Sequence, residues 1–180
     1  LLLEQDPALR IALAAPTGKA AARLTDAVRG GKGRVDAAPK FLAQVPEEAV
    51  TLHRLLGAGF GDTFRHNRDN PLLLDCLVVD EASMVDLALM AKLLRAVPEK
   101  ARLIIIGDKD QLASVEAGSV LGDICDRDSM HSFSAPFKNQ LAELTGENLD
   151  PIVPAAKVEY GLQDSIVVLP KSYRLDSASR

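Results

Sequence analysis

The sequence predicts an α/β domain whose mostly parallel sheet is covered by helices on both faces. Short apolar runs alternate with helix-forming stretches along the first 125 residues, a pattern typical of repeated strand–helix units. Two runs, at 72–81 and 101–108, are largely apolar without polar alternation, as expected for strands buried on both faces. Each of these runs ends in acidic residues, at the strand end where such sheets place their ligands.

The expected elements follow from apolar spacing and from the positions of proline and glycine. They are a strand at 10–15, a helix at 18–28 that stops at Gly30 and Gly31, a short helical turn at 51–59, a strand within 72–79, a helix at 83–97, a strand at 101–106 and a short helix at 117–125. The helix at 83–97 shows an apolar face at helical spacing, made of Met84, Leu87, Met90, Leu94 and Val97.

Residues 126–164 differ from the rest of the chain. They are polar, contain prolines and show no regular period, which predicts a surface excursion. A short helix is expected within 137–146, and 165–170 predicts a strand that ends in a basic and aromatic cluster. We expect a single partial domain over residues 1–180 that contains this excursion.

Composition fits a soluble globular protein of 180 residues with 47% hydrophobic content. No apolar run approaches the roughly 20 residues of a membrane span, so no membrane partner is expected. The net charge of −4 is uneven, since residues 1–70 carry an excess of two positive charges and the remainder an excess of six negative ones. A basic surface in the first part could meet phosphates. Cys76 and Cys125 fit no metal spacing and predict buried, reduced thiols of a cytosolic protein.

The stretch APTGKAAARL contains Gly18 and Lys19 in the order found in phosphate-binding loops. A Walker A loop requires a glycine five residues before Gly18 and a hydroxyl residue after Lys19. Leu13 and Ala20 occupy those positions. The stretch is therefore not a Walker A loop.

Two adjacent carboxylates, Asp80 and Glu81, follow an apolar strand. In phosphate-loop ATPases the strand aspartate holds Mg²⁺, and a neighbouring glutamate can accept a proton from the attacking water. An acidic helix start, favoured by the helix dipole, is the alternative.

Gln111 follows the second acidic strand end and could bond both a phosphate and water, whereas in isolation it is a loop residue beside a polar turn. Arg174, which lies beyond the excursion, could stabilise charge on a transferring phosphate. The alternative for Arg174 is an ordinary surface arginine.

Five stretches in order, APTGKAAARL, TLHRLLG, LVVDEASMVD, LIIIGDKDQLASVEAGSVLGD and KSYR, resemble motifs Ia, Ib, II, III and IV of superfamily 1 DNA helicases. The resemblance is greatest to the RecD family, the alpha subunits of exodeoxyribonuclease V. It implies a RecA-like core of the P-loop NTPase class that uses ATP and Mg²⁺. Asp80 would hold the metal, and Glu81, Gln111 and Arg174 would act on the nucleotide.

The resemblance also implies contacts with single-stranded DNA and DNA ends. The candidate DNA-binding residues are Pro16, Thr17, Gly18, Lys19, Thr51, His53 and Arg54. Local packing at a helix start is an equal alternative for His53. By resemblance the intact protein is a 5′-to-3′ helicase in double-strand break repair and recombination, working with the beta and gamma subunits of exodeoxyribonuclease V.

Motif I would precede residue 1, and motifs V and VI would follow residue 180. We therefore expect the 180-residue chain alone to be inactive as an ATPase and at most a weak DNA-binding module. A stand-alone helicase of the same type and another P-loop ATPase are the alternatives. The second acidic strand end and APTGKAA disfavour the latter.

Overall fold

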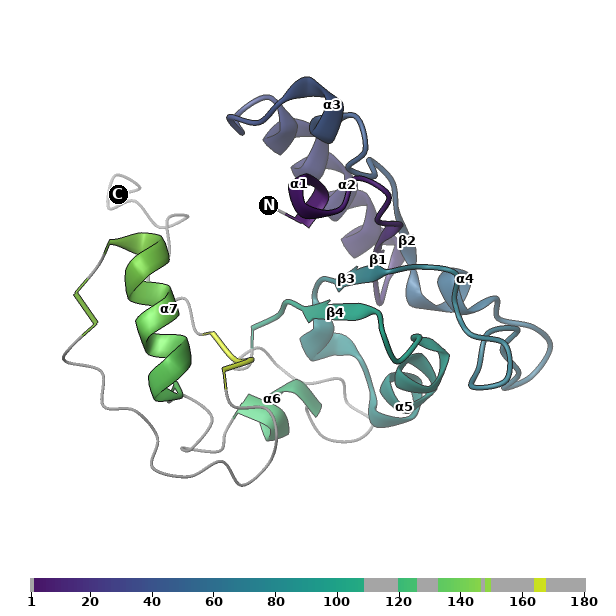
Figure 1. The fold of residues 1–180 in the computed structure, drawn as a ribbon. Helices are drawn as coiled ribbons and strands as arrows, with labels where there is room; N and C mark the ends of the chain where they lie inside the picture. The colour runs from purple at the N-terminus through teal and green to yellow at the C-terminus, as the bar shows by residue number, and fades with distance from the viewer. Residues whose placement is uncertain (1, 109–119, 126–132, 147, 150–163, 168–180) are drawn as a thin grey trace, which may run out of the picture. The chain divides into compact units, whose positions relative to one another are not determined.

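The computed structural model describes residues 2–108, 120–125, 133–146, 148–149 and 164–167 (Figure 1). The chain divides into two compact units, Leu1–Gly122 and Asp123–Arg180. Among the described residues, no helix has both the length and the apolar character that crossing a membrane requires.

A four-stranded parallel sheet forms the first unit. Its strands are β1 (Ile11–Ala15), β2 (Ala49–Thr51), β3 (Cys76–Val79) and β4 (Arg102–Ile105), in the order β2-β1-β3-β4. This confirms the predicted parallel sheet. The sequence did not predict β2, because three half-buried residues are too few to show a strand pattern.

Helices lie on both faces of this sheet, as predicted. The first unit contains α1 (Leu2–Gln5), α2 (Gly18–Lys32), α3 (Pro39–Leu42), α4 (Leu52–Leu56) and α5 (Leu87–Ala96). Through α2 the chain steps from β1 to β2 at one edge, and through α5 it steps from β3 to β4 in the opposite direction. Because parallel crossovers are right-handed, the two helices lie on opposite faces (Figure 1). The expected short helix near 117–125 is α6 (Val120–Cys125).

The predicted end of α2 at Gly30 and Gly31 is wrong, because the helix continues to Lys32 and is capped by Gly33. Tertiary contacts hold this last part of the helix. Lys32 Nζ lies 2.8 Å from a carboxylate oxygen of Glu47. Neither Gly30 nor Gly31 has a positive φ, so neither forms the left-handed turn with which glycine commonly ends a helix.

The predicted start of the next helix at 83 is also wrong. Residues Ala82–Met84 form a 3₁₀ turn, and α5 begins after Asp86, whose Oδ1 accepts from Leu89 N at 2.7 Å. Asp86 is an effective N-cap because it satisfies a helix N–H that has no intrahelical partner.

The buried face of α5 agrees with the predicted one only at Met90. Leu89, Met90, Leu93 and Ala96 are buried, whereas Met84, Leu87 and Leu94 are exposed. Two adjacent stripes of this helix are apolar, so spacing alone could not select between them. The other large side chains that are fully buried come from β3, α4 and the turn before α5, namely Leu77, Val79, Leu52, Leu56 and Val85.

The second unit contains α7 (Ala135–Thr145), which confirms the helix expected within 137–146. Its N-cap, Ser134, donates its backbone N–H and its hydroxyl to the two carboxylate oxygens of Asp164, each at 2.6 Å. Residues 165–167 are not part of a strand, so the strand expected at 165–170 is wrong there. Its remaining residues lie outside the described part of the chain.

Candidate functional site

The parallel register brings the carboxyl ends of all four strands to one edge of the sheet. Ala15 pairs with Thr51, Ala14 with Val79, and Val79 with Ile105. The predicted site residues of the first unit that the structure describes all lie at or just after these strand ends. Ligands of parallel sheets bind at this edge, so the register supports a shared functional site.

Asp80 is fixed in place by its backbone at the end of β3. Its N–H donates to the carbonyl of Ala14 at 3.0 Å, which ties it to the neighbouring strand β1. Its Oδ1 accepts from the N–H of Glu81 at 2.9 Å. The side chain is half-buried, so the carboxylate lies at the sheet edge in a fixed position.

Glu81 has a left-handed backbone, with φ 53° and ψ 39°. For a residue other than glycine this conformation costs about 1 kcal/mol, and such residues concentrate at functional sites. Hydrogen bonds on the following turn maintain it, since Ala82 N donates to Ile106 O at 3.0 Å and Met84 N to Glu81 O at 3.1 Å.

Gly107 brings the end of β4 against this turn. A Cβ at Gly107 would lie 3.1 Å from Ser83 N, 3.2 Å from Ala82 N and 2.6 Å from a Leu121 methyl carbon. Only a residue without a side chain permits this close approach. From the sequence Gly107 is only the end of a strand, because nothing local signals its contact with residues 82–83.

The loop after β1 leads into the N-terminus of α2. Thr17 caps this helix, with its Oγ1 accepting from Ala20 N at 3.2 Å. Gly18 and Lys19 are exposed, and Pro16 is half-buried. Exposed N–H groups at the start of a helix attract anions, so this loop has the chemistry of a phosphate contact.

The junction of β2 and α4 repeats the capped helix start on the neighbouring strand. Thr51 caps α4 by accepting from Arg54 N at 3.2 Å, and His53 and Arg54 are exposed. The His53 ring lies 5.8 Å, centroid to centroid, from that of Phe64. The local packing considered for His53 is therefore present, and its exposed side remains available for a ligand.

The strand order separates these residues into two halves of one edge. β2 and β1 carry the two capped helix starts and the cations Lys19 and Arg54. β3 and β4 carry Asp80, Glu81 and the Gly107 approach. The first half suits a polyanion, and the second suits a metal-bound phosphate. Gln111 and Arg174 lie outside the described residues, so their placement stays a prediction.

The metal expectation depends on Asp80. In the part of the chain that the structure describes, no group of three or more His, Cys, Asp or Glu side chains could hold a metal. Mg²⁺ commonly uses one or two carboxylates together with phosphates and waters. Asp80 therefore fits a magnesium ion that arrives with a nucleotide, and not a dedicated metal cage.

The thiols differ from the sequence expectation in one respect. Cys76 in β3 is buried and Cys125 is half-buried, and neither is in a disulfide. Burial raises the pKa of the Cys76 thiol. Neither residue follows a strand end, so neither belongs to the candidate site.

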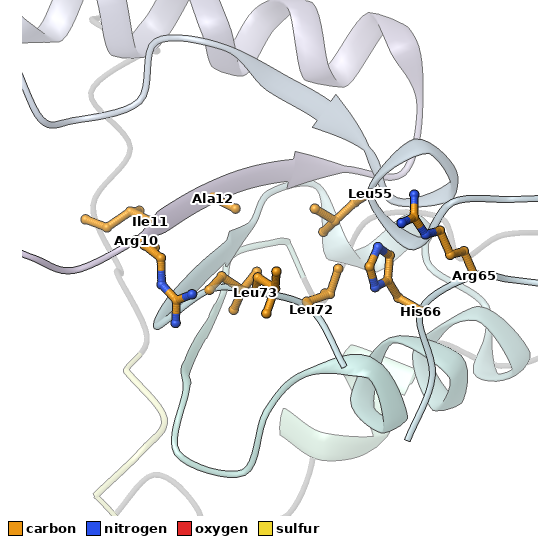
Figure 2. A pocket seen from close by; sticks show the side chains of 9 residues that line it. Arg10, Ile11, Ala12, Leu55, Arg65, His66, Leu72 and Leu73 are labelled. Atoms are coloured by element: carbon orange, nitrogen blue, oxygen red, sulfur yellow. The ribbon is translucent and has the colours of Figure 1, made fainter. Parts of the chain in front are cut away.

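A pocket of about 410 Å³ lies elsewhere, beside the amino end of β1 (Figure 2). Leu55 and Leu72 contribute apolar surface, and Arg10, Arg65 and His66 contribute polar surface. None of the predicted site residues lines this pocket. Arg10 is also engaged, since its guanidinium makes two bonds of 2.8 Å to Asp75.

Known proteins similar to this chain include RecD subunits of the RecBCD enzyme and a RecD2 DNA helicase. The chain is 46% identical over 171 residues to the RecBCD enzyme subunit RecD of Mycobacterium tuberculosis (strain ATCC 25618 / H37Rv), covering 94% of this chain and 29% of the relative. It is 39% identical over 179 residues to RecD of Haemophilus influenzae, covering 97% and 27%. It is 45% identical over 116 residues to the ATP-dependent RecD2 DNA helicase of Deinococcus radiodurans, covering 64% and 14%.

Among solved structures, unliganded Pif1 from Bacteroides sp matches with a TM-score of 0.36 and 22% identity, covering 69% of this chain and 27% of that one. A TM-score of 0.36 is too low to assign a fold, so the fold is defined by the strand order and register of the sheet.

A family model described as an AAA domain matches residues 1–117. The chain belongs to this AAA domain family. The RecD relatives confirm the resemblance expected from the five motifs. The chain spans less than a third of the length of these curated relatives.

Proposed function

We propose that the intact protein is an ATP-dependent 5′-to-3′ DNA helicase, the alpha subunit of exodeoxyribonuclease V, acting on DNA ends in double-strand break repair and recombination. Residues 1–180 would form part of its first RecA-like motor domain. The observation that carries this proposal is the two-part sheet edge, in which the Asp80 side is bonded directly to the strand that carries the Lys19 loop.

The chain's own residues would act in distinct roles on the nucleotide side. Bound ATP with Mg²⁺ supplies the free energy of phosphoryl transfer to water. Asp80 would hold the magnesium ion, and Glu81 would take the proton of the attacking water. Gln111 and Arg174 would contact the terminal phosphate.

On the other half of the edge, the start of α2 and the residues Thr17, Gly18 and Lys19 would hold the phosphates of single-stranded DNA. The start of α4 would contribute Thr51, His53 and Arg54, and Pro16 would shape the first loop. Contacts of this kind read the backbone and not the base sequence.

The test compares two carboxylate variants in the full-length protein. Asp80→Asn should weaken Mg²⁺-nucleotide binding and turnover together, because it removes a ligand. Glu81→Gln should preserve nucleotide affinity and reduce turnover, because it removes a base. DNA-stimulated ATP hydrolysis, strand unwinding and nucleotide binding are measured for each. A wild-type protein without DNA-stimulated hydrolysis would refute the function, and equal affinity losses would refute the division of roles.

A stand-alone helicase is the second candidate, favoured by the 45% identity to RecD2. In that case no beta or gamma subunit is required. Purification of the tagged full-length protein from its own cells separates the two, because a subunit should co-purify with both partners at equal stoichiometry through gel filtration.

A further inference from the structure

A short hairpin follows α4 in the first unit. The helix ends at Gly57, whose φ of +69° turns the chain back on itself. Gly59 N then donates to Thr63 O at 2.9 Å, and Arg65 N donates to Gly57 O at 3.0 Å. These bonds define the hairpin as residues 57–65. The hairpin directly follows α4, the helix that carries His53 and Arg54.

One lysine from another helix holds this hairpin. Lys92 in α5 forms an ion pair with the carboxylate of Asp62, near the hairpin tip. The same Nζ lies 4.9 Å from the centroid of the Phe64 ring. The Lys92 side chain is only 27% exposed, so its stem is packed and its ammonium is held in position.

The contacts continue to a candidate DNA-binding residue. The ring of Phe64 lies 5.8 Å from that of His53, at an interplanar angle of 43°. Lys92, Phe64 and His53 therefore form a continuous series of contacts from α5 to α4. A cation over a ring and a tilted pair of rings are both attractive arrangements.

We propose that Lys92 is a positioning residue for nucleic-acid binding, acting through Phe64 to fix the orientation of His53 on α4. This rests on the proposed function, since it assigns His53 to a DNA contact. An exposed histidine whose ring is not fixed would lose conformational freedom when it binds DNA. This loss of entropy would lower the affinity for DNA. Lys92 removes part of this cost before DNA arrives.

The geometry separates the expected effect of Lys92 from a direct charge effect. Its ammonium already has an anionic partner in Asp62 and faces an aromatic ring, so it is not placed as a phosphate contact. Loss of the Lys92 cation should weaken DNA binding indirectly, because the ring of His53 would no longer be held in its orientation. Hydrolysis at saturating DNA should continue at its normal rate, because Lys92 is not among the residues that would act on the nucleotide.

The experiment uses the full-length protein and a fluorescent oligothymidylate of fixed length. Lys92→Met keeps an unbranched stem and removes the charge, and we expect it to raise the Kd about three- to tenfold. The DNA concentration for half-maximal ATP hydrolysis should rise by the same factor, with kcat unchanged. Lys92→Arg should restore both values to within about twofold, because a guanidinium also stacks on aromatic rings and pairs with carboxylates.

Two further variants serve as controls. Lys100→Met removes an exposed lysine in the turn after α5 and should leave the Kd within about twofold. Phe64→Leu should weaken binding as Lys92→Met does, and the double variant should be no worse than either single one, because both act through the same ring.

Specific outcomes would overturn the proposal. One is a Kd for Lys92→Met within twofold of wild type, and another is an equal loss in Lys100→Met, which would indicate general charge attraction. A fall in kcat that Lys92→Arg does not restore would indicate a structural role only. A wild-type protein that does not bind the oligonucleotide would instead remove the proposed function itself, and this inference with it.

Discussion

The backbone N–H of Asp80 donates a hydrogen bond of 3.0 Å to the carbonyl oxygen of Ala14. This bond joins the carboxylate proposed for the nucleotide to the strand that leads into the Lys19 loop. The two candidate sites are thus one backbone hydrogen bond apart at the sheet edge. A displacement of the end of β1 would act directly on the position of Asp80.

Lys19 should contact the phosphates of DNA and not those of ATP. Lys19→Ala in the full-length protein should weaken single-stranded DNA binding about equally for all sequences. It should also reduce the slope of log K against log salt by roughly one or less. Binding titrations at several salt concentrations with two unrelated oligonucleotides measure both effects, with Lys100→Ala as the control. A defect confined to nucleotide binding would contradict this prediction. It would show that Lys19 binds ATP, although Leu13 and Ala20 do not fit a Walker A loop.

Arg174 should act on turnover. If its guanidinium meets the terminal phosphate, Arg174→Ala should lower kcat on the order of 10³-fold or more and leave DNA binding nearly unchanged. Arg174→Lys should restore little, because an ammonium lacks the planar fork. Single-turnover hydrolysis distinguishes the outcomes, and near-normal rates in both variants would leave Arg174 a surface residue.

Asp75 should make the stability of the first unit pH-dependent. Hydrogen bonds from the Arg10 guanidinium and then from its backbone N–H hold the pKa of Asp75 well below its usual range. Because the folded pKa is below the unfolded value of about 3.9, the stabilisation is complete above that pH. It is lost as the pH falls further toward the folded pKa.

We therefore expect Asp75→Asn to lower the urea midpoint of unfolding by a constant amount between roughly pH 5 and pH 8. The difference from wild type should shrink below about pH 4, near the pKa of Asp75 in the unfolded chain. Asp69→Asn, in an exposed loop position, serves as the control. A difference that grew toward acid would contradict this sign.

Gly107 should tolerate no side chain. Gly107→Ala would place a Cβ within 3.2 Å of two backbone nitrogens, which cannot move as a side chain can. We expect a loss of about 1–3 kcal/mol in the free energy of unfolding. Gly30→Ala is the matched comparison, since a Cβ there meets nothing within 4 Å and a helix interior favours alanine by about 0.5–1 kcal/mol. Equal effects of the two substitutions in urea unfolding would refute the close-approach explanation.

The sequence alone determined the fold class, and it predicted candidate site residues that the structure places at the carboxyl ends of the strands. Apolar runs closed by acids predicted β3 and β4. β3 is largely buried, as expected. The burial expected for the second run is wrong, because β4 is the last strand of the described sheet and has no buried residue. Thr17 follows β1, Thr51 is the last residue of β2, and both were predicted at helix starts. The nearest neighbours in the chain were enough to identify these residues.

Only the tertiary structure decided how those pieces meet. The continuation of α2 past Gly31 depends on the contact between Lys32 and Glu47, and the buried face of α5 depends on which of two apolar stripes meets the core. The need for glycine at position 107 and the contacts of Lys92 with Asp62 and Phe64 join residues that are distant in the chain. Local propensity carries no information about such partners, because their free energy arises from contacts that form only when the strands have taken their order in the sheet.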